Sequence, residues 1–389
     1  MGSIPKRIFF ISNSIVPLDH TSGGSVVIYR HLKRFRDEGY KVIVIYLNAF
    51  SNTECPGDFE YFFIRRKTWH PPFRKKTPAL TSLRISLIYK QLNKLFRFQQ
   101  YHDIVFGVLG EVSNLLHLKI KYRTGTPFYL FFHDDYLFNR YGTNNLLSDS
   151  NIGNILQNAS YIFAASDALK EQLISRGIDH TDTIYPIPGS QKNLYNELKF
   201  SGDRGPRLLT SGSTGPVHFK TLKAIGRAAS ATGGKFYCCS NLPATFYPEL
   251  MAGNIIGRPL FRTLDQLFTF IAEEIDILVV FYSFDAAIEP RILTSFPSKF
   301  IEYCRLGLPI LVVVPIESSI GRWATENKWL TYVDTEDPKK ISEQIENLKN
   351  PVFRESCRQQ CLSFSSGIFA PDFLHRRLTG HLINVSNSA

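Results

Sequence analysis

The stretch SFPSKFIEYCRLGLPILV, residues 295–312, carries the signals of a short helix that leads directly into a strand. Ser298 suits the N-cap of that helix, Gly307 suits the left-handed position past its end, and Pro309 prevents its continuation. The apolar residues that follow, 310–312, indicate a buried strand. We therefore expect a short helix that enters a sheet at this point.

The same alternation of apolar strands and helical patterns runs through both halves of the chain. The expected strands are 7–11, 41–46, 104–108, 128–132 and 161–164 in the first half, and 207–210, 235–239, 277–281 and 310–314 in the second. The expected helices include 26–37 and 219–229, with helical patterns over 338–365 and 372–384. Strands separated by helices predict parallel sheets covered on both faces.

A chain of 389 residues exceeds what one hydrophobic core usually supports, so two domains are expected. The predicted fold class is α/β, with two Rossmann-like doubly wound domains that face a central cleft. We expect a first domain at 1–190, a second at 191–370, and a C-terminal helix in 371–389 that packs back towards the first domain. The polar segment 192–206 suits a hinge, and ligands are expected at the carboxyl ends of the strands.

The net charge of +11 is unevenly distributed. No acidic residue lies between Glu60 and Asp103, and ten Lys and Arg residues in that window are interleaved with apolar ones. A basic amphipathic segment over residues 65–98 is typical of contact with an anionic membrane surface. A helix with an apolar core face and a solvated basic face would give the same pattern. Nucleic acid would be attracted by the same charge and is the least favoured partner.

The sequence excludes several other classes of protein. The apolar run near the N-terminus is interrupted by Ser12, Asn13 and Ser14, which argues against a signal peptide, and no apolar run is long enough for a membrane span. The six cysteines lack the spacing of a zinc site or a disulfide framework. We expect a cytoplasmic protein, with peripheral attachment to the inner face of the membrane through the basic segment.

The helix predicted after Pro297 has the features of an anion site. The free amides at a helix N-terminus and the helix dipole favour an anion, and Lys299 adds a full positive charge. Glu302 lies about one turn deeper, about 6 Å away, where its carboxylate can accept the hydroxyls of a vicinal diol. A diphosphate attached to ribose has this spacing. A capped surface helix with a solvated glutamate is the alternative.

The segment 296–312 resembles the nucleotide-sugar segment of glycosyltransferase family 4 and its GT-B-fold relatives. Other motifs of that family follow in the same order along the chain. They are Gly23-Gly24 at a helix start, His133-Asp134 after a strand, Gly212-Ser213 with Lys220, and Pro297-Ser298-Lys299 with Glu302. The resemblance therefore spans nearly the whole chain.

This resemblance implies a glycosyltransferase, of hexosyl type and active in polysaccharide biosynthesis. The donor would be a nucleotide-sugar, with a UDP-sugar favoured over a GDP-sugar, and the acceptor a glycan or a polyisoprenyl-linked glycan. The implied catalytic residues are His133, Asp134 and Lys220, and the implied donor-binding residues are Gly23, Gly24, Gly212, Ser213, Lys220, Pro297, Ser298, Lys299 and Glu302. The reaction would be retaining, with no cofactor and no metal, because lysines and amides stabilise the departing diphosphate.

The sequence departs from the family pattern at two positions. Thr294 stands where a first glutamate is common, and the basic residue usually found before the lysine is missing, with His218 nearest to that place. A nucleotide-sugar epimerase of the same fold and a non-catalytic nucleotide-sugar-binding protein therefore remain alternatives. A nicotinamide-dependent dehydrogenase and a P-loop phosphohydrolase are disfavoured, because neither glycine motif is present.

Overall fold

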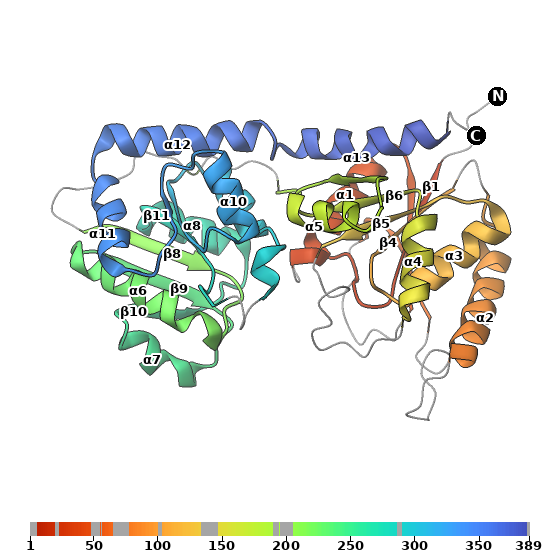
Figure 1. Ribbon diagram of the computed structural model, residues 1–389, viewed down its shortest axis with the longest axis horizontal. Coiled ribbons are helices and arrows are strands. Elements are labelled where there is room, and N and C mark those ends of the chain that lie inside the picture. The colour runs from red at the N-terminus through yellow and green to blue at the C-terminus, as the bar shows by residue number, and fades with distance from the viewer. Residues whose placement is uncertain are drawn as a thin grey trace. The chain divides into compact units, whose positions relative to one another are not determined.

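The computed structural model describes residues 6–19, 23–47, 55, 57–64, 78–99, 103–133, 147–189, 194, 205–285 and 290–386. The chain forms two compact units (Figure 1). Unit 1 comprises Met1–Ile187 with Leu374–Ala389, and unit 2 comprises Pro188–Phe373. The domain boundaries expected from the sequence lie a few residues from these divisions. Most of the segment 192–206, expected to be a hinge, lies outside the described residues.

Unit 1 is built on a seven-stranded sheet in which all pairs are parallel. The strands are β1 Arg7–Ser12, β2 Lys41–Tyr46, β3 Glu60–Phe63, β4 Asp103–Val108, β5 Phe128–Phe132, β6 Tyr161–Ala164 and β7 Thr181–Thr183, in the order β3-β2-β1-β4-β5-β6-β7. The helices are α1 Gly23–Asp37, α2 Pro78–Phe96, α3 Ser113–Thr124, α4 Asp149–Asn158, α5 Asp167–Ile174 and α13 Pro371–Ser386.

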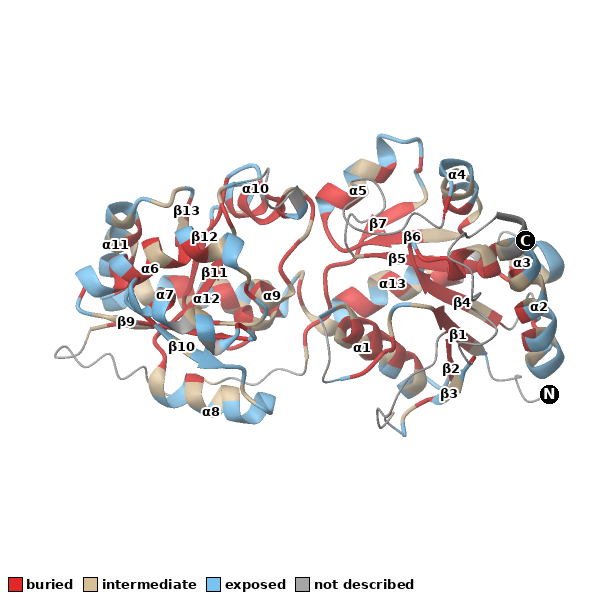
Figure 2. Ribbon diagram, turned by 90° about the horizontal axis from the view of Figure 1, so that it is seen from below, coloured by how far each residue is buried: buried red, intermediate tan, exposed pale blue. Residues whose placement is uncertain are grey.

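The core of unit 1 lies on both faces of this sheet, as Figure 2 shows by the red strands. In β1, Ile8 and Phe10 face the cluster that contains Leu32 of α1 and Leu378 of α13. Phe9 and Ile11 of β1 face the opposite cluster, to which α2, α3, α4 and α5 contribute. Because successive side chains of a strand point to opposite faces, a continuous apolar run is required when helices cover both.

Unit 2 repeats this architecture with a six-stranded parallel sheet. Its strands are β8 Arg207–Ser211, β9 Lys235–Ser240, β10 Ile255–Pro259, β11 Ile277–Phe281, β12 Ile310–Val313 and β13 Tyr332–Val333, in the order β10-β9-β8-β11-β12-β13. Its helices are α6 Phe219–Ala231, α7 Tyr247–Met251, α8 Leu264–Glu274, α9 Ser298–Cys304, α10 Ser319–Glu326, α11 Pro338–Asn347 and α12 Pro351–Ser366. Short 3-10 helices are η2 Pro216–His218, η3 Ala244–Phe246 and η4 Pro290–Leu293.

Both sheets have the doubly wound strand order, in which the chain starts near the middle and reverses direction once. The predicted α/β fold class with two Rossmann-like units is confirmed. Four short strands, β3, β7, β10 and β13, were not expected, and all of them lie at or next to the edge of a sheet. The cleft expected between the two domains stays a prediction.

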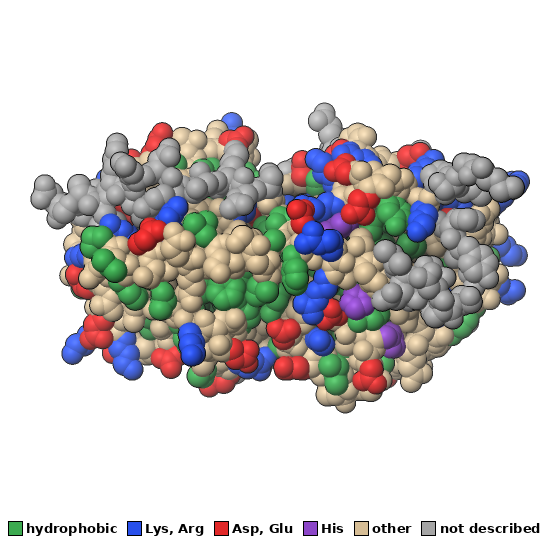
Figure 3. All heavy atoms as spheres, turned by 90° about the horizontal axis from the view of Figure 1, so that it is seen from above, with side chains coloured by type: hydrophobic (Ala, Val, Ile, Leu, Met, Phe, Trp, Pro, Cys, Tyr) green, Lys and Arg blue, Asp and Glu red, His purple; other side chains and the backbone are tan. Residues whose placement is uncertain are grey.

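In each unit, Figure 3 shows described Lys and Arg side chains interspersed with Asp and Glu. Among the described residues, no helix is long and apolar enough to cross a bilayer.

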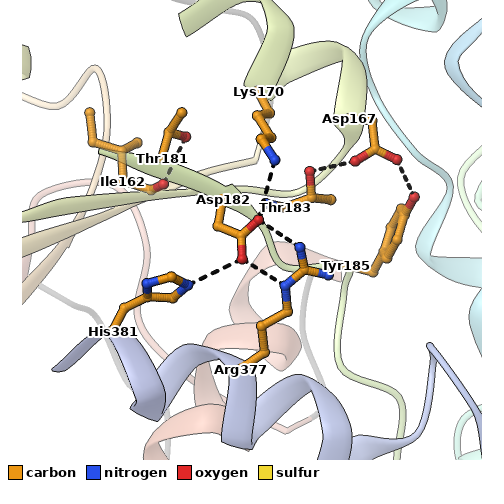
Figure 4. A network of polar contacts seen from close by, with 9 residues as sticks. All are labelled: Ile162, Asp167, Lys170, Thr181, Asp182, Thr183, Tyr185, Arg377 and His381. Carbon is orange, nitrogen blue, oxygen red and sulfur yellow. Dashed lines mark hydrogen bonds and ion pairs between the residues drawn. The ribbon is translucent and has the colours of Figure 1, made fainter. Parts of the chain in front are cut away.

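Helix α13 is fixed to unit 1 by a polar network around Asp182 of β7 (Figure 4). Arg377 donates two hydrogen bonds of 2.6 Å to the two carboxylate oxygens, and His381 contacts the same carboxylate at 3.1 Å. Lys170 of α5 lies 3.4 Å away. Burial alone would raise the pKa of Asp182, but the hydrogen bonds from Arg377, its charge and the contact with His381 lower this pKa to about 2.

Candidate functional site

The carboxyl ends of β8 and β11 form the switch point of unit 2, where the connections leave the sheet in opposite directions. Ligands of doubly wound sheets bind at such points, because the two loops diverge there and leave room above the strand ends. Ser211 ends β8 and Gly212 follows it, and Phe281 ends β11. The side chains around these three residues form the candidate site.

Gly212 and Lys299 lie close together at this switch point. The φ of Gly212 is +131°, a conformation that side chains disfavour. A Cβ atom at this position would lie 3.4 Å from the Lys299 Nζ atom. The Lys299 ammonium also lies 5.9 Å from the centroid of the Phe281 ring. Two of the predicted donor-binding residues are thus brought together, with a positive charge above the ends of β8 and β11.

His218 joins this group from the end of η2. Its ring meets the Phe281 ring edge-on, with centroids 5.6 Å apart and an angle of 88°. Burial lowers the pKa of His218, and the positive charges of Lys299 and Arg291 lower it further, to about 4. The imidazole is therefore neutral at pH 7. The sequence indicated His218 only as the basic residue nearest to a missing one.

Helix α9 begins one residue earlier than the sequence suggested. Pro297 is the cap residue, with no side-chain cap bond, and Ser298 is the first helical residue, so the prediction of Ser298 as N-cap is wrong. The ring of Pro297 fixes its φ at −72°, and its carbonyl oxygen accepts a hydrogen bond from the Phe300 N–H at 2.9 Å. The predicted left-handed conformation of Gly307 is confirmed, with φ at +71°.

Helix α9 is held in place by its apolar face and by Tyr303. The Phe300 ring packs 5.2 Å from Trp323 and 4.9 Å from Trp329, centroid to centroid. The Ser211 N–H donates a 2.9 Å hydrogen bond to the Tyr303 hydroxyl, which joins α9 to the end of β8. These contacts set the position of Lys299, the neighbour of Phe300.

Glu302 is half-buried, and its carboxylate has two partners in unit 2. One oxygen forms an ion pair of 2.9 Å with Arg305, and the other accepts a 3.3 Å hydrogen bond from the Gly189 N–H. Arg305 is itself buried, since its side chain is 5% exposed. The carboxylate of Glu302 is thereby held at a defined place beside the start of unit 2.

Lys220 lies in the first turn of α6, and its side chain is 84% exposed. Its ammonium forms an ion pair of 2.5 Å with Glu336, whose other oxygen accepts a hydrogen bond from Thr221. The hydrogen bond and charge of Glu336 raise the pKa of Lys220. The structure therefore engages Lys220 with Glu336, and its assignment to the donor phosphates stays a prediction. Ser213, in the same loop as Gly212, is exposed.

The other predicted site residues belong to unit 1. Gly23 and Gly24 form the start of α1, and His133 follows β5 with its ring stacked 5.8 Å from Phe131. Asp134 lies outside the described residues. The roles of these residues in catalysis and donor binding stay predictions.

Glu111 occupies the corresponding switch point of unit 1, between β1 and β4, and the sequence analysis missed it. Its buried carboxylate accepts hydrogen bonds from the hydroxyls of Ser12 and Ser113 at 2.7 and 2.8 Å, and from Ser14. The Asn13 N–H donates a further bond of 2.8 Å. Burial raises the pKa of Glu111, and these four donors oppose that rise. The serines that interrupt the apolar run of β1 were the available signal for this site.

No metal centre is evident in the described part of the chain, where no three His, Cys, Asp or Glu side chains come together in a suitable group. The site in unit 2 instead offers cationic and backbone donors. It suits an anion rather than a metal ion.

Comparison with known proteins bears on the family and the fold of this chain. Residues 21–188 match the family model of Glycosyltransferase Family 4, which confirms the resemblance to that family over most of unit 1. No curated protein sequence matches the chain.

Solved structures match nearly the whole chain at low sequence identity. A glycosyltransferase from Rickettsia africae has a TM-score of 0.70 and 15% identity, covering 99% of this chain and 100% of that chain. Sucrose-phosphate synthase from Thermosynechococcus elongatus has a TM-score of 0.68 and 12% identity, with coverage of 99% and 100%. HepE from Anabaena, solved in complex with UDP and glucose, has a TM-score of 0.67 and 12% identity, with coverage of 97% and 99%. These likenesses confirm the GT-B fold.

Proposed function

We propose that this chain is a hexosyl-type glycosyltransferase that moves a sugar from a nucleoside-diphosphate donor to a glycan or lipid-linked acceptor in polysaccharide biosynthesis. The observation that carries the proposal is the Lys299 ammonium held against Gly212 at the switch point of unit 2. A diphosphate requires positive charge at the place where the backbone lets it approach closely, and a glycine beside a lysine meets both needs. Glu302, three residues further along α9, supplies the acceptor for ribose hydroxyls.

The chemistry follows from where charge develops during sugar transfer. Cleavage of the bond between sugar and diphosphate leaves negative charge on the departing phosphate, which the fixed ammonium of Lys299 stabilises. The Glu302 carboxylate orients the ribose, and Arg305 holds that carboxylate in place. A uridine diphosphate donor is favoured over a guanosine one, since the fold is shared with HepE, whose structure contains UDP and glucose.

The residues of unit 1 complete the proposal. His133 would hydrogen-bond the donor sugar, and the amides of Gly23 and Gly24 would lie near the transferred phosphates. Asp134 is assigned with His133 from the sequence motif, and Lys220, Ser213, Pro297 and Ser298 are assigned to the donor in the same way. We propose retention of configuration, with the departing phosphate receiving the acceptor proton, and no requirement for metal or cofactor.

The assay that tests this function is incubation with UDP-, GDP- and ADP-sugars, with and without a glycan acceptor. A transferase releases the nucleoside diphosphate slowly by hydrolysis and much faster when an acceptor is present. An epimerase converts the sugar without any acceptor, and a binding protein leaves the donor unchanged. Either of these last two outcomes would replace the proposed function with the corresponding alternative.

We further propose that the protein attaches peripherally to an anionic membrane surface at the cytoplasmic side through α2. The inner face of α2 is core, because Ile85, Ile88 and Leu92 are buried. Its outer face, pale blue in Figure 2, exposes Leu83 and Leu87, each 57% accessible. Lys90 and Lys94 are exposed on the same side of the helix. The basic residues 65–77 lie outside the described residues.

An exposed pair of leucines flanked by lysines suits the boundary between lipid head groups and acyl chains. We expect the double change Leu83→Glu and Leu87→Glu to lower co-sedimentation with phosphatidylserine-containing vesicles by roughly tenfold. The two leucines would no longer insert into the membrane, and the added carboxylates would oppose the attraction between the lysines and the anionic lipid. The control is Leu264→Glu, an exposed leucine of α8. Equal vesicle binding by the double variant and the control would show that α2 is only a solvated helix.

A further inference from the structure

His218 is the one histidine within the candidate site of unit 2 as described, and the preceding assignments do not use it. Its ring lies edge-on to Phe281, and the ammonium of Lys299 lies over the same ring. Lys299 in turn lies beside Gly212, the first residue after β8. The imidazole, the ammonium and the glycine backbone are therefore grouped around the ends of β8 and β11.

The charges that act on His218 are positive. Lys299 reaches it from α9 and Arg291 from η4, while the packed side of its ring meets the apolar Phe281 of β11. Two carboxylates of the candidate site are paired with other cations, Glu336 with Lys220 and Glu302 with Arg305. A histidine held among cations is kept neutral until a negative charge arrives.

We propose that His218 takes up a proton when a nucleoside diphosphate binds, and then donates a charge-assisted hydrogen bond to the diphosphate. This inference rests on the proposed function. The proton comes from solvent, so that neutral imidazole becomes imidazolium and no other bond is made or broken. The diphosphate brings the negative charge that offsets Lys299 and Arg291, which restores the basicity of the ring.

The proposal places His218 at the diphosphate in addition to Lys299 and to Lys220, which the sequence motif assigns to the donor. His218 lies on the Phe281 side of the η2–α6 segment, whereas Lys220 is exposed and bound to Glu336. A neutral histidine also makes nucleotide affinity depend on pH, which a lysine at the same place would not do near neutrality. Binding is expected to weaken as the pH rises, because fewer protons are available for uptake.

Calorimetry of UDP binding at pH 7 in buffers of different ionisation enthalpy tests this inference. The dependence of the observed enthalpy on the buffer enthalpy gives the number of protons taken up. We expect the intact protein to take up about one proton more than His218→Gln, and comparing the two proteins cancels the protonation of UDP itself. The affinity of His218→Gln should fall roughly tenfold, and His218→Lys should bind UDP without the extra uptake.

Arg227→Ala, at an exposed position of α6 outside the proposed site, is the matched control and should show the same proton uptake as the intact protein. Melting temperatures without ligand identify any variant that has failed to fold, and the lysine and glutamine variants provide independent readings. If UDP binds and the uptake is equal in the intact protein and both His218 variants, the inference is wrong while the proposed function stands. If none of UDP, GDP or ADP binds to the intact protein, the proposed function itself fails, and the inference with it.

Discussion

Gly212 carries two constraints at once. Its φ of +131° suits glycine, and a Cβ atom there would lie 3.4 Å from the Lys299 Nζ atom, so the position is also next to the candidate site. A neighbouring glycine in the same loop, Gly215, has an ordinary φ and no heavy atom near its Cβ position. The two positions therefore separate the effect of the site from that of a general loss of glycine in the loop.

We expect Gly212→Ala to lower the free energy of unfolding by about 1–3 kcal/mol, because alanine cannot adopt the native φ without strain. The same change should weaken nucleotide binding, because relief of the strain at φ would shift the loop beside Lys299. Gly215→Ala should leave both quantities within about 0.5 kcal/mol of the unaltered protein. Urea denaturation with and without UDP measures both effects. Equal behaviour of the two variants would show that Gly212 has no special place in the site.

Among the elements, α13 joins the C-terminal segment of the chain to unit 1. Its buried residues Leu378 and Leu382 join the cluster around Phe10, and Arg377 grips Asp182 on β7 (Figure 4). The bidentate geometry explains why an arginine is required, since a lysine cannot donate two parallel hydrogen bonds. The Asp182 network therefore orients α13 against the sheet, in addition to the apolar contacts that bind it.

Arg377→Ala should free α13 and lower the stability of unit 1 by about 1–3 kcal/mol, since a mostly buried Asp182 loses its main partner. Hydrogen exchange over residues 374–386 reports the release, and Arg376→Ala, an exposed neighbour, is the control. Unchanged protection of the helix in Arg377→Ala would contradict the role given to the network.

The pH dependence of α13 follows from the same carboxylate. The pKa of Asp182 is about 2 in the folded protein, below its ordinary value of 3.8. Because the pKa of Asp182 is lower in the folded protein, the stability that its carboxylate contributes is present in full above pH 4. This stability is lost as the pH falls towards 2. In acid unfolding experiments, Asp182→Asn should lose the part of the pH dependence that Asp182 causes. If the variant unfolds with the same pH dependence as the unaltered protein, other carboxylates are responsible for it.

The connection between β1 and α1 is held by hydrogen bonds to Glu111 that the sequence did not predict. Glu111, from the loop after β4, binds Ser12, Ser14 and the Asn13 amide, and so fixes the segment that leads towards α1. The carboxylate and the serines lie far apart in the chain. No local pattern could pair them, although serines inside an apolar strand end were a visible irregularity.

For the molecule as a whole, the sequence predicted the central strands well and the edges poorly. The strands Ile277–Phe281 and Ile310–Val313 are apolar throughout because both faces are covered, and this makes them easy to recognise. The edge strand β10 contains Gly257 and Pro259, and β7 is the polar triplet Thr181–Thr183. Such strands have one free side, so their sequences do not need the apolar run.

The candidate site was predictable where it depends on local motifs. The sequence assigned Gly212 and Lys299 to one donor site, and the two residues lie close together in the structure. It did not predict that Glu336, distant in the chain, would pair with Lys220, or that His218 would pack against Phe281. Those contacts depend on how α6, α11 and β11 pack, which no motif records.

The central claim is that unit 2 binds a nucleoside diphosphate beside Lys299. The most direct measurement is the thermal stabilisation of the protein by UDP, compared between the unaltered chain, Lys299→Ala and the control Lys339→Ala on the exposed face of α11. Ligand at about 100 times its dissociation constant stabilises the folded state by about 2.7 kcal/mol. We expect UDP to stabilise the unaltered chain and Lys339→Ala to this extent. Lys299→Ala should lose nearly all of this stabilisation. Absence of stabilisation by UDP, GDP or ADP, or equal stabilisation of all three proteins, would contradict it.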